Sequence, residues 1–260
     1  MTHRMKLEIA YDGRPFHGWQ RQKEQKTVQG EIENALTALF QGNRIPVVGA
    51  GRTDTGVHAS GQAAHIDAPG AIPPDALVRG LNSRLPPAIR ILGARAVSSS
   101  FHARNNALGK RYTYRARWQE PKLPWSEPRS ATIRPISNLS AMRSALDLLV
   151  GRHDWASFTV PDPGPNSTIR TLFSVRYRTL RSGFDLVFVG DGFLRYQVRR
   201  MVGLLLEIGA GDRRLRDIED LIDNPQPGAQ IRTARAHGLS LEHVYYRACP
   251  AVTRNCSVTP

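Results

Sequence analysis

Cysteine is nearly absent from this chain of 260 residues. The two cysteines, Cys249 and Cys256, lie close together near the C-terminus, which excludes a disulfide framework. Cysteines and histidines nowhere have zinc-site spacing. No apolar run has the roughly 20 residues that a membrane-spanning helix needs, and the first residues lead into an alternating pattern rather than a signal peptide. We therefore expect a reduced, cytoplasmic protein without a metal or a membrane segment.

Acidic residues are also scarce, with 22 Asp and Glu against 36 Lys and Arg, and the net charge is +14. Both the first 104 residues and the rest of the chain carry a basic excess, so the charge is not confined to one tail. A nucleic acid partner would explain this excess, and so would an ordinary solvated surface. Charge alone leaves both explanations open.

Hydrophobic residues make up 40% of the chain, which is enough for a buried core. In the first half, their spacing predicts elements in the order β-α-β-β-α-β, the split βαβ pattern. Thr27 is placed to cap the first helix. The predicted ranges are strand 5–11, helix 28–40, strands 45–50 and 62–66, helix 74–85 and strand 89–96.

The second half repeats this order, so we predict an α+β fold of two tandem split βαβ (ferredoxin-like) halves. Their sheets should be mixed and mainly antiparallel, with domains at 1–105 and 106–260 and an active-site cleft between them. Residues 119–135 hold four prolines and are expected to form an inserted loop. The predicted elements are strand 110–118, helix 139–150, a hairpin of strands 168–180 and 184–190, helices 193–208 and 215–222, and strand 239–245.

The densest polar motif is Gly-Ala-Gly-Arg-Thr-Asp-Thr-Gly-Val-His at 49–58. Its glycines permit tight turns and the close approach of a ligand, and polar side chains in a loop are typical of functional sites. A carboxylate at Asp54 beside Arg52 stays ionised and can act as a nucleophile or a base. The simpler interpretation is that Asp54 caps a turn and Arg52 is its surface partner.

Several motifs in order resemble those of the tRNA pseudouridine synthase A family, over nearly the whole chain. Ordered motifs at compatible spacing are far more specific than any single one. They are Tyr-Asp-Gly at 11–13, Gly-Trp-Gln-Arg-Gln at 18–22, Gly-Arg-Thr-Asp-Thr-Gly-Val-His at 51–58, Phe-His-Ala-Arg at 101–104, Lys-Arg-Tyr-Thr-Tyr at 110–114, Gly-Phe-Leu at 192–194, Val-Arg at 198–199, Met-Val-Gly at 201–203, Glu-Ile-Gly-Ala-Gly at 207–211, Arg-Thr-Ala at 232–234, Gly-Leu at 238–239 and Val-Tyr-Tyr at 244–246.

The resemblance implies an isomerase that converts uridine to pseudouridine in the anticodon stem-loop of tRNA, at tRNA positions 38–40. It implies tRNA as the partner, a homodimer, and no cofactor or metal. The family's essential aspartate falls on Asp54. Attack on the base, attack on ribose C1′ and removal of a ribose proton all remain open as its role.

The resemblance also assigns supporting residues. Arg52 and Arg199 are expected to support the carboxylate, and the predicted substrate-binding residues are Tyr112, Arg52, Thr53 and His58. Tyr112 alternates with other aromatics on a predicted strand, so a core position would also explain it. Arg199 lies among other arginines on a predicted helix, so a solvated basic face would also explain it.

Some positions depart from the family pattern without removing a catalytic candidate. They could alter RNA binding or substrate choice. The departures are Asn105, Asn106, Tyr196, Gln197, Arg200, Arg235 and Ser240.

Two other functions fit parts of the sequence. A non-catalytic RNA-binding protein on an RRM-like scaffold would use Tyr112 and Tyr114 as stacking platforms and would not need Asp54. A glycoside-cleaving hydrolase would need a second carboxylate beside the bond, and Asp12 and Asp67 lie in no comparably polar motif.

Overall fold

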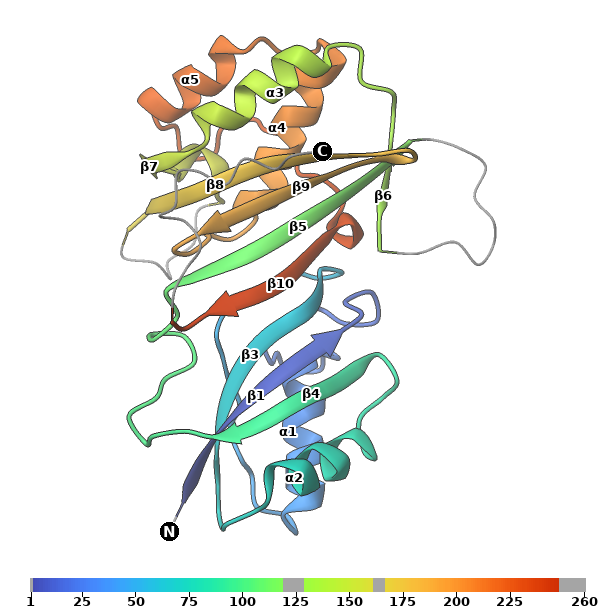
Figure 1. The fold of residues 1–260 in the computed structure, drawn as a ribbon, viewed down its shortest axis with the longest axis vertical. Helices are drawn as coiled ribbons and strands as arrows, with labels where there is room; N and C mark the ends of the chain where they lie inside the picture. The colour runs from blue at the N-terminus through green and yellow to red at the C-terminus, as the bar shows by residue number, and fades with distance from the viewer. Residues whose placement is uncertain (1, 119–128, 161–166, 248–260) are drawn as a thin grey trace, which may run out of the picture. The chain divides into compact units, whose positions relative to one another are not determined.

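The computed structural model describes residues 2–118, 129–160 and 167–247. This part of the chain has an α+β fold with ten strands and five α-helices, and most strand pairs are antiparallel (Figure 1). The chain divides into two compact units. Unit 1 is formed by the residues up to Ala107 and by Ser240–Val244, and unit 2 by Leu108–Leu239 with the residues from Tyr245 onward.

Unit 1 has the element order that its hydrophobic periodicity predicts. Helix α1 begins where expected, because the Thr27 hydroxyl accepts a hydrogen bond from the Gly30 backbone at 3.3 Å. The elements are β1 (His3–Tyr11), α1 (Val28–Leu39), β2 (Val48–Gly49), β3 (His58–Ala68), α2 (Pro74–Asn82) and β4 (Ile89–Ala96).

The sheet of unit 1 has β1 in the middle, paired antiparallel with β3 on one side and β4 on the other. Leu7 and Ile9 on β1 are fully buried, as are Ile32 and Leu36 on α1. β2 pairs with one part of β3, and Ser240–Leu241 of β10 (Leu239–Tyr245) runs parallel to another part. Alternating apolar residues thus bind one sheet face to the helices.

Two predicted strands of unit 1 have different lengths in the structure. The strand expected at 45–50 contains only the two residues of β2, since only Val48 and Gly49 pair with β3. β3 begins at His58, four positions before the strand predicted at 62–66. Small residues fill this start of β3, and they give no strong strand pattern in the sequence.

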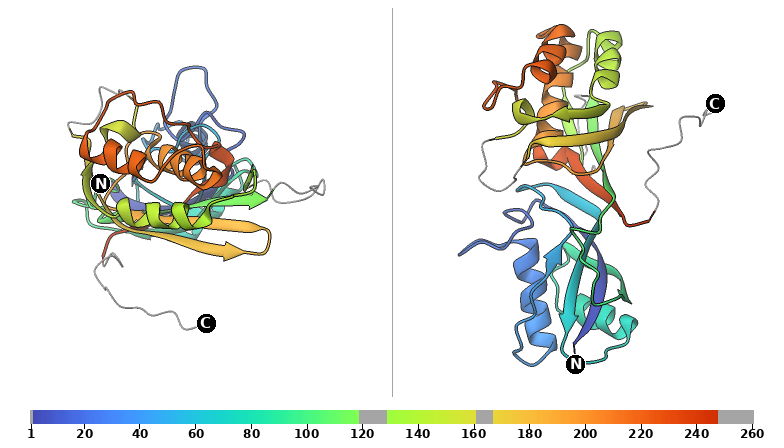
Figure 2. Two further views of the ribbon diagram at one scale, coloured as in Figure 1. Left: turned by 90° about the horizontal axis from the view of Figure 1, so that it is seen from above. Right: turned by 90° about the vertical axis from the view of Figure 1, so that its left-hand side faces the viewer.

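Unit 2 has a sheet in which β5, β9, β8 and β7 pair antiparallel in that order. A short strand, β6, pairs parallel with β5. Helices α3, α4 and α5 lie beside one another (Figure 2). The elements are β5 (Gly109–Trp118), β6 (Ala131–Ile133), α3 (Leu139–Leu148), β7 (Gly151–Asp154), β8 (Ile169–Leu180), β9 (Gly183–Gly190), α4 (Gln197–Ala210) and α5 (Arg216–Asp223).

Three features of unit 2 correct the sequence prediction. The helix expected at 193–208 begins only at Gln197, because Tyr196 has a left-handed backbone with φ of 62° that no α-helix can contain. β6 lies in the stretch predicted as an inserted loop, of which residues 119–128 lie outside the described ranges. The sequence predicts neither β6 nor β7, because both strands are too short to produce a detectable hydrophobic period.

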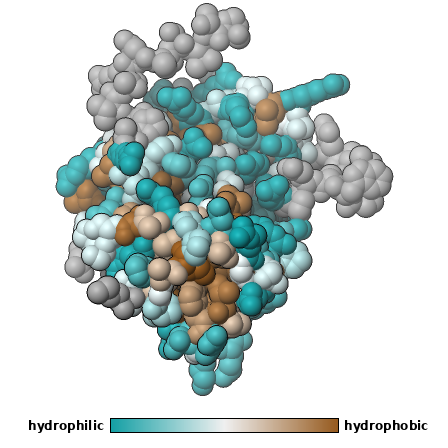
Figure 3. Space-filling view, turned by 60° about the horizontal axis from the view of Figure 1, so that its bottom comes forward, coloured by the Kyte–Doolittle hydropathy of each residue, from teal (hydrophilic) through white to brown (hydrophobic). Residues whose placement is uncertain are grey.

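Hydrophilic side chains surround a smaller area of hydrophobic ones on the face shown in Figure 3. Large hydrophobic side chains that are exposed in the described ranges are Leu92, Leu108, Val150 and Ile169. Scattered exposure of this kind is ordinary for a folded chain. No helix among the described residues is long and apolar enough to cross a membrane.

Candidate active site

Asp54 lies in the loop between β2 and β3 of unit 1, and its side chain is partly exposed. The loop closes in a tight turn, in which the backbone nitrogen of Val57 donates to the carbonyl of Asp54 at 3.1 Å. Gly56 within this turn has φ of +80°, a conformation that favours glycine. The aspartate is therefore presented on a turn of defined geometry.

Thr53 ties this loop to the segment that follows β1. Its hydroxyl lies 2.8 Å from the Tyr11 hydroxyl, and its carbonyl accepts a hydrogen bond from the Trp19 backbone at 3.1 Å. Gly18 makes the approach possible, because a Cβ there would lie 2.6 Å from the Thr53 carbonyl oxygen. We call this set of contacts the Thr53 clamp. It fixes the backbone immediately before Asp54.

Trp19 extends the clamp into the core. Its indole is 2% exposed, and Gly49 of β2 packs so closely that a Cβ there would lie 2.6 Å from the ring. The carbonyls of Gly18 and Trp19 also accept the backbone hydrogen bonds of Val28 and Gln29 at the start of α1. The Asp54 loop is thus connected to the first helix through a few short backbone contacts.

His58 holds the other end of the loop. The sequence predicts a loop position for His58, but the structure makes it the first residue of β3. Its exposed fraction is 1%. Its Nδ1 lies 3.2 Å from both the Gly13 backbone nitrogen and Oδ1 of Asp12. That nitrogen accepts from Gly13 when unprotonated and donates to Asp12 when protonated. A buried His58 is placed to position the loop.

Two ionisable groups beside the loop have shifted pKa values. Burial raises the pKa of the Tyr11 phenol, so that its hydroxyl remains a hydrogen-bond donor. Burial acts against the charge of Asp12, but hydrogen bonds from Arg14 and the charge of His58 outweigh it, and the pKa of Asp12 lies below its usual range. Asp12 is therefore a stable anion under the loop.

Arg52 is exposed and makes no hydrogen bond or ion pair with any other residue in the described ranges. Its guanidinium group is accordingly accessible to a ligand on the surface of unit 1. Among the described residues, no three His, Cys, Asp or Glu side chains are grouped so that they could hold a metal ion.

Tyr112 lies on β5 in unit 2, where it is 6% exposed. Its ring meets Phe193 edge to face, with centroids 5.1 Å apart. Phe193 lies in the Gly-Phe-Leu motif just before α4. The ring of Tyr112 is therefore held in one orientation by aromatic packing.

Arg199 lies on the first turn of α4 and is partly exposed. Its Nε donates to the carbonyl of Ala234 at 2.8 Å, and the Ala234 backbone nitrogen donates to the Arg199 carbonyl at 3.0 Å. The guanidinium also lies 5.2 Å from the centre of the Tyr196 ring. Arg199 is thus oriented by its hydrogen bonds with Ala234 and by the cation–π contact with Tyr196.

Arg200 is more deeply buried than its neighbour Arg199, with 7% exposure. It donates to the carbonyls of Ser157, at 3.1 Å, and of Ala229. Burial lowers the pKa of its guanidinium. Arg200, which departs from the family pattern, therefore has a structural role that the sequence did not reveal.

A partly exposed carboxylate on a clamped loop, in a strongly basic α+β chain, is the kind of site that an enzyme of nucleic acids would use. The sequence model of the family described as tRNA pseudouridine synthase matches residues 9–106 and 145–247, which is more than half of the chain. The chain belongs to this family.

Curated relatives are similar to this chain over nearly its full length. The chain is 39% identical over 249 residues to tRNA pseudouridine synthase A of Lactobacillus helveticus, which covers 95% of each chain. It is 37% identical to the protein of the same name from Latilactobacillus sakei, covering 95% of this chain and 100% of the relative. The Anoxybacillus flavithermus protein of that name is also 37% identical, covering 94% and 98%.

The Thr53 clamp predicts a large effect of Gly18→Ala. Gly18 has φ of +85° and contacts Thr53, whereas Gly42 has φ of +92° with open space around it. Gly42→Ala should cost only the backbone strain of about 1–2 kcal/mol, and Gly18→Ala should cost roughly 1–3 kcal/mol more through the clash with Thr53. Urea unfolding of both variants measures the difference. Equal destabilisation would show that the close approach is unimportant.

The lowered pKa of Asp12 predicts a pH-dependent contribution to stability. Its charged form is favoured in the folded state, so the contribution is present above the pKa of an unfolded aspartate and is lost as the pH falls through the folded value. Asp12→Asn should therefore lower the free energy of unfolding at neutral pH, and the difference from wild type should vanish in acid. Exposed Asp75→Asn is the control. A difference that does not change with pH would contradict the assignment.

Proposed function

We propose that this chain is an isomerase that converts uridine to pseudouridine in tRNA, with Asp54 as its catalytic carboxylate. One observation carries the proposal. Asp54 occupies the aspartate position of the family motif, and the Thr53 clamp and His58 hold that motif in place. The family match on residues 9–106 includes the whole of this loop.

The reaction breaks the bond from ribose C1′ to N1 of uracil and forms a new bond from C1′ to C5. N1 gains a proton and C5 loses one, so no electrons are exchanged with another molecule. Attack on the base, attack on C1′ and removal of a ribose proton each require a carboxylate against the ribose of a base that has left its stack. A partly exposed aspartate on a fixed turn suits all three routes.

The loop residues can now be given separate roles. The burial of Thr53 and His58 supports a positioning role for both, in place of the direct RNA contact expected from the sequence. Arg52 is exposed and keeps the predicted role of an RNA contact, since a planar guanidinium binds a phosphate with two hydrogen bonds. The loop would then combine one catalytic group with one phosphate contact.

Tyr112 and Arg199 are proposed as the partners of Asp54 by resemblance. The Tyr112 ring would stack on the displaced uracil, which requires that RNA binding expose more of the ring than the present 6%. Arg199 would orient the carboxylate and keep it ionised. Their support in the structure is local: aromatic packing holds Tyr112, and contacts with Ala234 orient Arg199.

Further features are also proposed from the resemblance to the family. The target uridines would lie in the anticodon stem-loop, and the enzyme would act as a cytoplasmic homodimer. The halves would be split βαβ domains with a boundary near residue 105 and an active-site cleft between them. In unit 1, the antiparallel pairing of β4, β1, β3 and β2 supports the split βαβ assignment.

Asp54→Asn tests the proposal, since it keeps the shape of the side chain and removes its charge. The variant should fold and bind tRNA but should release no tritium from tRNA labelled at C5 of uridine. Asp75→Asn, an exposed aspartate on α2, removes the same charge and should stay active.

Tritium release by Asp54→Asn close to that of wild type would exclude Asp54 as the catalytic group. Free uracil among the wild-type products would instead indicate a hydrolase. Wild-type protein that binds tRNA tightly and never modifies it would indicate the non-catalytic RNA-binding function.

A further inference from the structure

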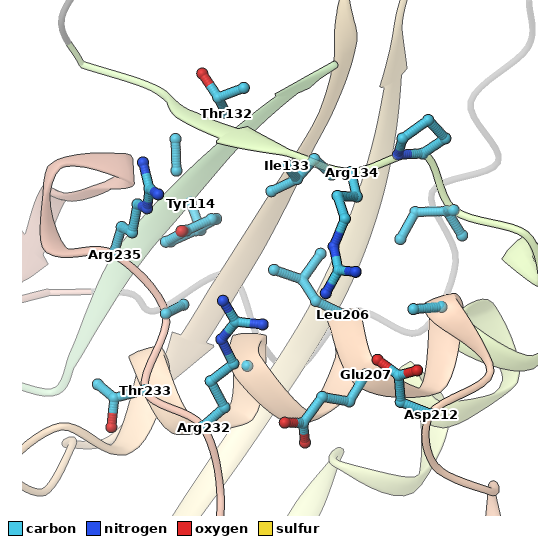
Figure 4. A pocket seen from close by; sticks show the side chains of 16 residues that line it. Tyr114, Thr132, Ile133, Arg134, Leu206, Glu207, Asp212, Arg232, Thr233 and Arg235 are labelled. Carbon is cyan, nitrogen blue, oxygen red and sulfur yellow. The ribbon is translucent and has the colours of Figure 1, made fainter. Parts of the chain in front are cut away.

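A cavity of about 450 Å³ lies within unit 2, and neither Tyr112 nor Arg199 lines it. Its walls come from β5 and β6, from α4, and from the segment 232–235 that precedes β10 (Figure 4). Three arginines line it, Arg134, Arg232 and Arg235, and we call it the arginine pocket.

The three arginines are exposed, and no side chain among them makes a hydrogen bond or ion pair with another residue in the described ranges. Figure 4 shows the guanidinium groups of Arg134 and Arg232 pointing toward the middle of the pocket from opposite sides. Like charges that converge on one space repel one another. An anion placed between them would be attracted by more than one guanidinium group.

The two acidic residues of the lining, Glu207 and Asp212, are outnumbered by the three arginines. Glu207 forms an ion pair with Arg213 at 3.1 Å, and neither acid pairs with a pocket arginine among the described residues. Tyr114, buried in the wall, is also no counterion. Burial raises the pKa of its phenol, although Arg199, Arg235 and Arg232 act in the opposite direction. The pocket therefore keeps an excess of positive charge.

The wall that carries Arg232 and Arg235 is held firmly. A Cβ on Gly203 of α4 would lie 1.7 Å from the Arg232 carbonyl oxygen, so the helix and this segment are in close backbone contact. Ala234, between the two arginines, is hydrogen-bonded on both its nitrogen and its oxygen to Arg199. The arginines thus project from a backbone of fixed position, which is a property of binding sites.

We propose that the arginine pocket binds a phosphodiester group of the substrate RNA. The proposal rests on the function proposed above, and it adds a substrate contact in unit 2. Guanidinium groups bind phosphate oxygens with paired hydrogen bonds. Because the three arginines are exposed, a phosphate of an RNA strand at the surface can reach them. Arg235 departs from the family pattern, so it gives this chain a phosphate contact of its own.

This contact would also link RNA binding to Arg199. Ala234 lies between Arg232 and Arg235 in the sequence, and its carbonyl accepts a hydrogen bond from the Arg199 side chain. RNA docked on Arg232 and Arg235 would therefore press on the segment that orients Arg199. The pocket would help to place the RNA in register with the proposed catalytic residues.

The test is the affinity for tRNA of Arg134→Ala/Arg232→Ala over a series of salt concentrations. Loss of phosphate contacts should weaken binding by about tenfold or more at low salt and reduce the log–log salt slope by roughly 0.7–0.9 per contact. The control, Arg176→Ala/Arg181→Ala, removes the same charge from exposed positions on β8 and its turn. It should retain the wild-type slope. Thermal melting verifies that both proteins fold, and the four single variants are measured in parallel.

Equal affinity and slope in the pocket and control variants would overturn the proposal. Inorganic phosphate and uridine monophosphate provide a second comparison. Tight binding of either by wild type, lost in the pocket variant without a change in tRNA affinity, would assign the pocket to a free anion instead. Arg134→Lys/Arg232→Lys keeps the charge without the planar fork and should recover only part of the affinity.

The outcome is separable from that of the proposed function. If wild type binds tRNA without modifying it, the proposed isomerase activity fails, while the salt dependence still decides the role of the pocket. If wild type modifies tRNA and the pocket variant binds like the control, only the pocket proposal fails.

Discussion

The close backbone contact at Thr53 is the constraint on which the proposed active site depends. A glycine at position 18 lets two chain segments approach within hydrogen-bond distance, and Trp19 then donates to Thr53. The carbonyls of Gly18 and Trp19 also accept hydrogen bonds from the first backbone nitrogens of α1. The loop is therefore connected to a cooperatively formed helix, which restricts its motion. Asp54 follows directly, so the backbone that carries it is held in place by these contacts.

Three sets of arginines in unit 2 occupy distinct environments: Arg200, Arg199 and those of the arginine pocket. Arg200 is buried and bound to backbone carbonyls, so it stabilises the fold. Arg199 is oriented by Ala234 and remains partly exposed. Those of the arginine pocket are exposed, and their side chains have no hydrogen-bond or ion-pair partner in the described ranges. The positive charge of the chain is therefore partly structural and partly placed for an external anion, a difference that composition cannot reveal.

Long periodic elements could be predicted from the sequence. α1 and β8 have close to their expected bounds, because many apolar residues define each period. β6 and β7 were missed, since their few residues define no period. The late start of α4 depends on the left-handed backbone of Tyr196, which a tyrosine rarely adopts and which propensity does not predict.

The candidate site was predicted from a resemblance more than from its residues. Asp54 alone would have been interpreted as a turn cap. The burial of Thr53 and His58 became clear only in the structure, because it depends on Tyr11 and Gly13, far away in sequence. The exposed position of Arg52 also became clear only there. Glycines at 13 and 18, beside polar residues, were the available signal of a close chain approach.

The most direct test of the central claim is pseudouridine mapping at single-nucleotide resolution in unmodified tRNA, after incubation with wild type or with Asp54→Asn. The account predicts pseudouridine at uridines of the anticodon stem-loop with wild type and none with the variant. Pseudouridine at the same positions with Asp54→Asn, or none with a folded wild type that binds the tRNA, would contradict it.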